Sequence, residues 1–271
     1  MSDPSAPYVL GSSDQEIERL DRQSASLERP TRLLLQAAGV APGMRVLDLG
    51  TGVGHVATLL AERVGPQGSV VGLDSNERLL QVAGARAAAL PQLRFVQGDV
   101  RDWRDDEPFD AVVGRLILFH LADPLAVVRY HAAALRAGGL WLALDFDLGA
   151  SRSVPPVPLV DQALGWVSGA FARAGANPAI GTRLAPLLAQ AGLAEVQGFG
   201  VQGYSAGDDP RGPALLTAVV RSLVPQIVAC GLATPAQIGI DTLEQRLREA
   251  IVAAGAVVVL PTLVGAWGRR R

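Results

Sequence analysis

The sequence predicts an α/β protein built on a mostly parallel sheet with helices on both faces. Between residues 45 and 146, short apolar stretches typical of strands alternate with stretches of helical periodicity. Parallel strands need crossovers of this length, and right-handed crossovers cover both faces of a sheet. In addition, 49% of the 271 residues are hydrophobic and 18% are charged, which is enough apolar material for a large core.

The expected elements follow one another in a regular order. Strands are predicted at 45–49, 69–73, 93–97, 109–113 and 140–146, and helices at 56–64, 76–90 and 124–136. Before them, a helix over 14–27 and a second helix over 30–38, opened by Pro30, are expected. After residue 149, helices are predicted at 159–174, 183–191, 213–228 and 242–253, and strands at 195–204 and 256–267. Ligands of such sheets bind beyond the carboxyl ends of the strands, so the chemistry is expected there.

Composition excludes several kinds of chemistry. The sequence contains no lysine, so all 24 basic residues are arginine, and a lysine Schiff base or a P-loop lysine is excluded. One cysteine and three histidines exclude a disulfide framework and thiolate zinc sites. A net charge of −2, with no dense arginine run before the last three residues, argues against nucleic acid as the main partner.

The ends of the sequence bear on its location. Its first residues are polar and proline-rich, whereas a secretory signal needs a basic start and an apolar run. Residues 250–267 carry no charge, but their glycines, Pro261 and a β-branched cluster are more typical of a strand than of a membrane span. The sequence therefore predicts a soluble, cytoplasmic protein without a membrane partner.

A glycine-rich turn, Gly50-Thr51-Gly52-Val53-Gly54, follows the strand at 45–49. Such a turn presents free backbone N–H groups and allows a ligand to approach the backbone closely. Asp74 ends the next strand, where a carboxylate can accept hydrogen bonds from a ribose diol. Asp99 ends the third strand, where an adenine edge would lie. The last glycine of the turn comes one residue earlier than in the dinucleotide fingerprint, which disfavours a nicotinamide-dependent oxidoreductase.

These motifs resemble those of the class I S-adenosylmethionine-dependent methyltransferases over about residues 44–147. Residues 46–54 are similar to the family's first motif, Asp74 to its ribose acid, 98–99 to its adenine motif and 136–140 to its turn before the fifth strand. A looser similarity, to the ubiquinone-biosynthesis-like (type 11) small-molecule group, covers most of the chain.

The resemblance implies a Rossmann-like, seven-stranded, mostly parallel sheet in which an antiparallel last strand lies between the fifth and sixth. It implies a single domain over 1–271. Its parts would be an N-terminal helical cap (1–42), a cofactor-binding core (43–149), substrate-cover helices with the sixth strand (150–254) and the last strand (255–271).

The implied cofactor is S-adenosyl-L-methionine. The residues expected to bind it are Asp48, Gly50, Thr51, Gly52, Gly54, Asp74, Ser75, Asp99, Val100 and Arg115. For Asp48 the alternative is a satisfied carboxylate at a strand end, and for Arg115 it is a surface ion pair. A metal is not expected: Asp145 and Asp147 alternate onto one face, but the strand at 109–113 is followed by Gly114 and Arg115 without a carboxylate ligand.

The catalytic residues are harder to infer, because methyl transfer needs a base only when the acceptor must lose a proton. His120 is the first candidate base, since it follows the fourth strand and an imidazole titrates near working pH. A capping or packing role is its alternative. Tyr8 is the second candidate, either folding over the cofactor or packing as an ordinary tyrosine. His131 is expected to be structural, and His55 to neighbour the cofactor.

The predicted function is methyl transfer to O, N or C of a small biosynthetic metabolite, by in-line displacement in a site that positions the acceptor. The apolar, Pro- and Ala-rich stretch after residue 149 favours a hydrophobic acceptor. The alternative is a protein of this fold that binds the cofactor without methylating, as a cyclase-like or regulatory protein. The acceptor and the oligomeric state stay open.

Overall fold

The computed structural model describes residues 14–271, and these divide into two compact units. The first, here called the core unit, comprises 14–145, Ile180–Gly200 and Val264–Arg271. The second, here called the helical unit, comprises Phe146–Ala179 and Val201–Leu263. The single domain with four parts stays a prediction.

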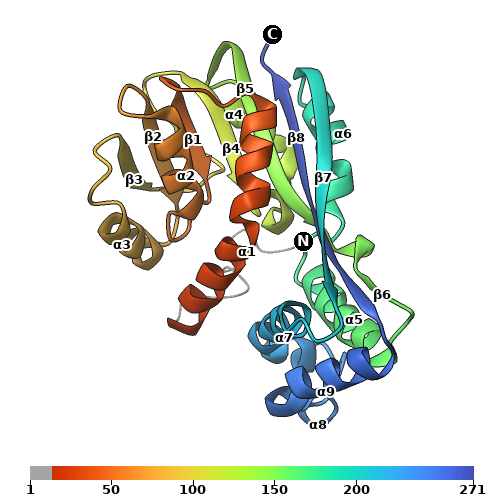
Figure 1. Ribbon diagram of the computed structural model, residues 1–271. Helices are drawn as coiled ribbons and strands as arrows, with labels where there is room; N and C mark the ends of the chain where they lie inside the picture. The colour runs from red at the N-terminus through yellow and green to blue at the C-terminus, as the bar shows by residue number, and fades with distance from the viewer. Residues whose placement is uncertain (1–13) are drawn as a thin grey trace. The chain divides into compact units, whose positions relative to one another are not determined.

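The sheet confirms the predicted fold class. Its strands are β1 (Arg45–Leu49), β2 (Ser69–Asp74), β3 (Leu93–Gln97), β4 (Phe109–Arg115), β5 (Leu135–Asp147), β6 (Arg152–Val154), β7 (Ala194–Ala206) and β8 (Val257–Arg269). Their order is β3-β2-β1-β4-β5-β8-β6, and β7 also pairs with β8 (Figure 1). The pairs from β3 to β5 are parallel, and the last strand, β8, is antiparallel to β6.

Within residues 14–271 the sheet has eight strands, so the expectation of seven was wrong by one. The additional strand is β6, whose three residues pair with Val257 to Val259 of β8. No strand was predicted between residues 147 and 194, and prolines directly follow these three residues in the sequence. The strand expected at 256–267 is present as β8 and lies next to β5, as predicted.

The core unit contains most of the predicted helices. They are α1 (Asp14–Ala38), α2 (His55–Val64), α3 (Glu77–Arg86), α4 (Pro124–Ala132), α6 (Leu184–Gln190) and the 3₁₀ turns η1 (Leu118–His120) and η3 (Ile180–Arg183). Several boundaries differ from the prediction; α3, for example, ends at Arg86 and not at residue 90. The helix α1 continues through Pro30 instead of breaking there. The helix α4 ends at Ala132, because Leu135 already belongs to β5 and pairs with Phe109.

The helical unit is built around α7. Its helices are α5 (Pro158–Arg173), α7 (Arg211–Ala229), α8 (Pro235–Ile238), α9 (Ile240–Ala253) and the 3₁₀ turn η2 (Leu148–Ala150). The helix α7 packs against α5 and α9. Among the described residues, α7 is long and apolar enough to cross a membrane by length and composition alone, a test that core helices of soluble proteins also pass.

The C-terminal half of α1 is anchored in the core unit by apolar side chains. Leu27, Leu34 and Leu35 are buried, and Leu34 lies against β8. A Cβ built on Gly265 would lie only 2.6 Å from Leu34 Cδ2, so the helix and the strand approach closely at this point. This packing holds one end of α1 on the sheet despite the backbone hydrogen bond that Pro30 removes.

Truncation of this anchor should destabilise the protein. Leu34 is 0% exposed, whereas its neighbour Leu33 is 49% exposed. We expect Leu34→Ala to lower the free energy of unfolding by about 2–5 kcal/mol through lost burial and a cavity. The matched control Leu33→Ala should change it by less than about 0.5 kcal/mol. Urea unfolding followed by circular dichroism measures both, and equal effects would contradict this account of α1.

Candidate functional site

The glycine turn between β1 and α2 has a backbone that favours glycine. The φ angles of Gly50, Gly52 and Gly54 are +65°, +55° and +82°, in the left-handed region where other L residues are strained. A Cβ on Gly50 would lie 2.7 Å from Ile117 Cδ1, and a Cβ on Gly54 would lie 2.9 Å from Phe95 Cζ. The turn therefore needs glycine for both conformation and space.

Phe95 of β3 supports this turn from below. It is the register partner of Gly72 in β2, and a Cβ on Gly72 would lie 2.6 Å from Phe95 Cδ1. The ring thus occupies the space left by Gly54 in the turn and by Gly72 within β2. The missing side chains at these two positions let the third strand pack against the turn.

Asp74 ties the end of β2 to the glycine turn. Its Oδ2 accepts a hydrogen bond from the Gly52 N–H at 2.8 Å, and its Oδ1 accepts one from the Asn76 N–H at 2.9 Å. Burial raises the pKa of Asp74, and these backbone donors act in the opposite direction. The next predicted residue, Ser75, is exposed, and its carbonyl accepts from Gln97 Nε2 at 3.2 Å. The acid expected at the ribose position therefore lies beside the turn.

The loop after β3 contains Asp99 and Val100. Asp99 Oδ1 accepts from the Arg101 N–H at 2.8 Å, and its carboxylate pairs with the Arg101 guanidinium. These hydrogen bonds with Arg101 lower the pKa of Asp99. The Val100 carbonyl lies 2.6 Å from His131 Nε2. Because His131 is 1% exposed and its pKa falls to about 4 through burial, the neutral ring donates this bond, which fits the structural role predicted for it.

Asp48 and Arg115 place two charged groups inside the core unit at the ends of β1 and β4. Burial raises the pKa of Asp48 to about 7; the Arg115 charge acts against this shift and the Asp74 charge adds to it. Burial also lowers the pKa of Arg115 to about 10, which leaves it cationic at neutral pH. Arg115 donates to Ser24 Oγ at 2.8 Å and to Thr31 Oγ1 at 3.1 Å, both on α1, so it is not in the surface ion pair given as its alternative.

His55 begins α2 directly after the turn. Its Nε2 lies 2.8 Å from Asp21 Oδ1 of α1, and Asp21 also accepts two bonds from the Arg86 guanidinium of α3, at 2.8 and 2.9 Å. Burial lowers the pKa of His55. The pKa of Asp21 is lowered as well: partial burial opposes this shift, but the hydrogen bonds from Arg86 and His55 outweigh it.

The two catalytic candidates have different outcomes. His120 lies in η1, beyond the carboxyl end of β4, and burial together with the Arg19 charge lowers its pKa to about 4. The imidazole is therefore neutral at pH 7 and retains a nitrogen lone pair that can accept a proton or hydrogen bond. Tyr8 lies outside the described residues. The catalytic roles of both stay predictions.

The two carboxylates weighed as a metal pair have other partners. Asp145 is buried in the core unit and accepts from the Phe119 N–H at 3.2 Å. Asp147 caps η2 in the helical unit and accepts from the Gly149 N–H at 3.0 Å. Over residues 14–271, no group of three or more His, Cys, Asp or Glu side chains is arranged to hold a metal ion.

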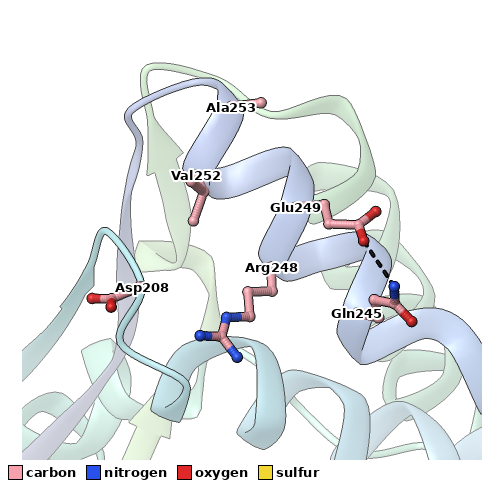
Figure 2. A pocket seen from close by; sticks show the side chains of 6 residues that line it. All are labelled: Asp208, Gln245, Arg248, Glu249, Val252 and Ala253. Atoms are coloured by element: carbon pink, nitrogen blue, oxygen red, sulfur yellow. Dashed lines mark hydrogen bonds between the residues drawn. The ribbon is translucent and has the colours of Figure 1, made fainter.

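A hollow of about 580 Å³ opens in the helical unit (Figure 2). It is lined by Asp208, Gln245, Arg248, Glu249, Val252 and Ala253. All six residues are exposed, and Gln245 donates to Glu249 at 2.8 Å. None of them is a predicted site residue, so the hollow adds nothing to the site at the strand ends of the core unit.

The residues at the end of β1 fit S-adenosylmethionine. Asp48 Oδ2 and Thr51 Oγ1 are buried and have no hydrogen-bond partner of normal geometry in residues 14–271, although the nearby Thr51 side chain acts to lower the pKa of Asp48. The Asp48 carboxylate suits an ammonium group, and the Asp74 carboxylate suits the hydroxyl groups of a ribose. Unsatisfied buried oxygens are rare in folded proteins, and a bound ligand that donates to them would explain these two.

One part of this site was not predicted from the sequence. Asp21, Ser24 and Thr31 had no predicted role, although α1 contacts His55 and Arg115 through them. A polar residue at every third or fourth position, on the helix face that also carries Leu27, was the available signal. Such a face predicts contact with polar side chains of another element, but it does not identify which residues these are.

The comparisons with known proteins agree with this geometry. Residues 46–139 match the family described as the methyltransferase domain. Over 112 residues the chain is 35% identical to a trans-aconitate 2-methyltransferase of Rhizobium rhizogenes, covering 41% of this chain and 42% of that protein. The chain spans between 38% and 52% of the length of the first curated relatives that it matches.

Two solved structures share the fold over most of the chain. A putative methyltransferase from Bacillus halodurans has a TM-score of 0.58 at 21% identity, covering 89% of this chain and 98% of that one. The [4+2]-cyclase SpnF has a TM-score of 0.51 at 18% identity, covering 87% of this chain and 79% of that one. At such identities the likeness shows the fold alone.

Removal of the Asp74 carboxylate should weaken cofactor binding. We expect Asp74→Ala to raise the Kd for S-adenosylmethionine about 10- to 100-fold, or about 1.4–2.8 kcal/mol, because ribose acceptors and the Gly52 contact are lost together. The control Asp106→Ala removes an exposed carboxylate from the loop before β4. Titration calorimetry measures both variants, and an unchanged Kd in Asp74→Ala would exclude the ribose role.

Cofactor affinity should rise with pH around neutrality. With a pKa of about 7, Asp48 is protonated at pH 6 and mostly ionised at pH 8. A ligand that is cationic near this carboxylate favours the ionised form, so binding releases a proton below pH 7. We expect affinity to increase by up to about tenfold per pH unit below the pKa and then to level off. Calorimetry from pH 6 to 8 should show this rise, and Asp48→Asn should abolish it.

Proposed function

Because the chain carries a class I S-adenosylmethionine-dependent methyltransferase domain, we propose that it transfers the methyl group of this cofactor to a small-molecule acceptor. The observation that carries the proposal is the arrangement at the strand ends of the core unit. Asp74 is hydrogen-bonded to the glycine turn there, beside the buried Asp48 carboxylate. Both acids lie in strands next to the glycine turn, where they suit the ribose and the amino group of the cofactor.

Each part of the chain at this edge has its own task. Asp74 and the Gly52 turn would hold the ribose, the loop of Asp99 and Val100 would lie at the adenine, and Asp48 would receive the amino group. Arg115 would pair with the carboxylate of the cofactor's methionine part. Its guanidinium is available for this because its acceptors on α1 are neutral hydroxyl groups and it retains its charge.

Bound S-adenosylmethionine supplies an electrophilic methyl group on a sulfonium, which needs no further activation. The work of the chain is then to align the acceptor atom with that methyl group and to exclude water. His120 is the proposed acceptor of a proton or hydrogen bond from the acceptor molecule. Its neutral state at pH 7 suits this role, although a pKa of about 4 makes it a weak base.

The acceptor class rests on composition and on one relative. The trans-aconitate 2-methyltransferase that the chain resembles acts, by its name, on a small molecule. The Pro- and Ala-rich sequence of residues 150–254 favours a hydrophobic acceptor over a protein or nucleic acid. We include three further points in this proposal. The protein acts in biosynthesis, it is located in the cytoplasm, and the helices of this stretch cover the acceptor.

A second candidate function is cofactor binding without methyl transfer. The likeness to the [4+2]-cyclase SpnF supports this second candidate, because that protein has the same fold and its name describes a reaction other than methyl transfer. The glycine turn and Asp74 predict cofactor affinity in both cases. Only the fate of the cofactor separates the two functions.

Product analysis tests the proposal. The protein is incubated with methyl-labelled S-adenosylmethionine and a panel of aromatic, polyketide, terpenoid and carboxylic-acid acceptors. We expect S-adenosylhomocysteine to accumulate together with a labelled product for at least one acceptor. Cofactor binding with no demethylated product across the panel would favour the second function, and no binding at all would contradict both.

The role of His120 is tested on the acceptor found in this way. His120→Phe keeps an aromatic ring beside Phe119 but removes the nitrogen lone pair. If the imidazole accepts a proton, kcat should fall about 100-fold or more while the Kd for the cofactor is unchanged. An unchanged kcat would show that the site acts by positioning alone.

A further inference from the structure

The helix α1 crosses the ends of three neighbouring strands. Thr31 and Ser24 bind Arg115 at the end of β4. Further toward the N-terminus, Asp21 binds His55, which follows the glycine turn after β1. Asp14 at the helix start pairs with Arg78 in α3, which follows β2, at 2.6 Å. From its C-terminal to its N-terminal half, α1 therefore contacts the end of β4, the start of α2 and the start of α3 in turn, along the edge proposed to hold the cofactor.

The two halves of α1 are held by different forces. The buried residues around and after Pro30 are mainly apolar (Leu27, Leu34 and Leu35), with the polar Thr31 among them, whereas those nearer the N-terminus are Glu16, Arg19 and Ser24. Pro30 lies between the halves and removes one helical hydrogen bond. Figure 1 shows α1 bending in its middle, and interior prolines commonly cause such bends. The two parts of the helix are therefore held in the core unit by different kinds of contact.

Asp21 makes the central polar contact of this N-terminal half. Its carboxylate accepts a bidentate pair of hydrogen bonds from the Arg86 guanidinium and a third hydrogen bond from His55. Asp21 therefore joins α1 to both α2 and α3. Bidentate, charge-assisted hydrogen bonds are stronger and more directional than single hydrogen bonds between neutral groups. By comparison, the exposed Glu18 on the same half pairs with Arg22 within α1.

We propose that Asp21 is a positioning residue of the cofactor site, which holds the N-terminal half of α1 across the glycine turn by binding His55 and Arg86. This inference rests on the proposed function, because it assumes that the cofactor binds beside the turn. Loss of the contact would free His55 next to Gly54 and let the helix half move away. The bound cofactor would then be released faster, while the chemistry of a saturated site would be little changed.

Cofactor binding to Asp21→Asn tests the proposal directly. This variant keeps an oxygen acceptor but loses the charge. We expect the Kd for S-adenosylhomocysteine, measured by calorimetry, to rise about three- to tenfold, as for the loss of a partly exposed charged contact. Arg86→Gln, which removes the partner, should behave alike. The matched control Glu18→Gln should bind as the wild type does.

Hydrogen exchange provides a readout that is independent of activity. In the wild type, S-adenosylhomocysteine should protect the amides of residues 16–26; in Asp21→Asn this protection should be largely lost. The double variant Asp21→Arg with Arg86→Asp restores an opposite-charge pair and should regain part of the affinity, which a merely structural effect of each change would not give.

The outcomes separate the two proposals. If the wild type binds no S-adenosylhomocysteine, the proposed function fails. If the wild type binds it and Asp21→Asn shows the same Kd and the same protection of residues 16–26, the positioning role of Asp21 is overturned. An Asp21→Asn variant that binds normally but has a lower kcat would also overturn it, because the residue would then act on the chemistry.

Discussion

The hydrogen bond from the Gly52 N–H to Asp74 determines the shape of the whole ligand edge. It joins the first strand–helix connection to the end of the second strand, so the turn cannot move without that strand. The carboxylate that makes it is also bonded to the Asn76 N–H, which aligns it with the start of α3. A single acid thus connects the turn, β2 and the start of α3, and the remaining site residues are arranged around it.

Electrostatics add a second constraint at the same edge. Asp48 and Arg115 are held in the interior, where charged groups lose their hydration. The arginine is compensated by two hydroxyl groups of α1, whereas one oxygen of the aspartate has no partner among residues 14–271. Such an arrangement costs folding free energy in the free protein, and a ligand with a positive group would offset that cost on binding. We interpret the buried aspartate as a site prepared for its ligand.

Local features of this protein could be predicted from its sequence, whereas contacts between distant segments could not. The glycine turn, Asp74 and the boundaries of β1 and β3 follow from patterns within about ten residues, and the structure has them where expected. The partners of Arg115 were missed because Ser24 is 91 residues away in the chain. The break expected at Pro30 was wrong, because apolar packing of the C-terminal half against β8 is a tertiary effect that helix propensity does not include.

The Phe95 ring has a consequence for the packing around the glycine turn. It stands on β3, the strand whose end leads to Asp99, and it fills the space above Gly72 and below Gly54. The ring therefore links the position of β3, and of the Asp99 loop that follows it, to the position of the glycine turn. A smaller side chain at this position would leave a cavity beside Gly54 and Gly72 and would weaken that link.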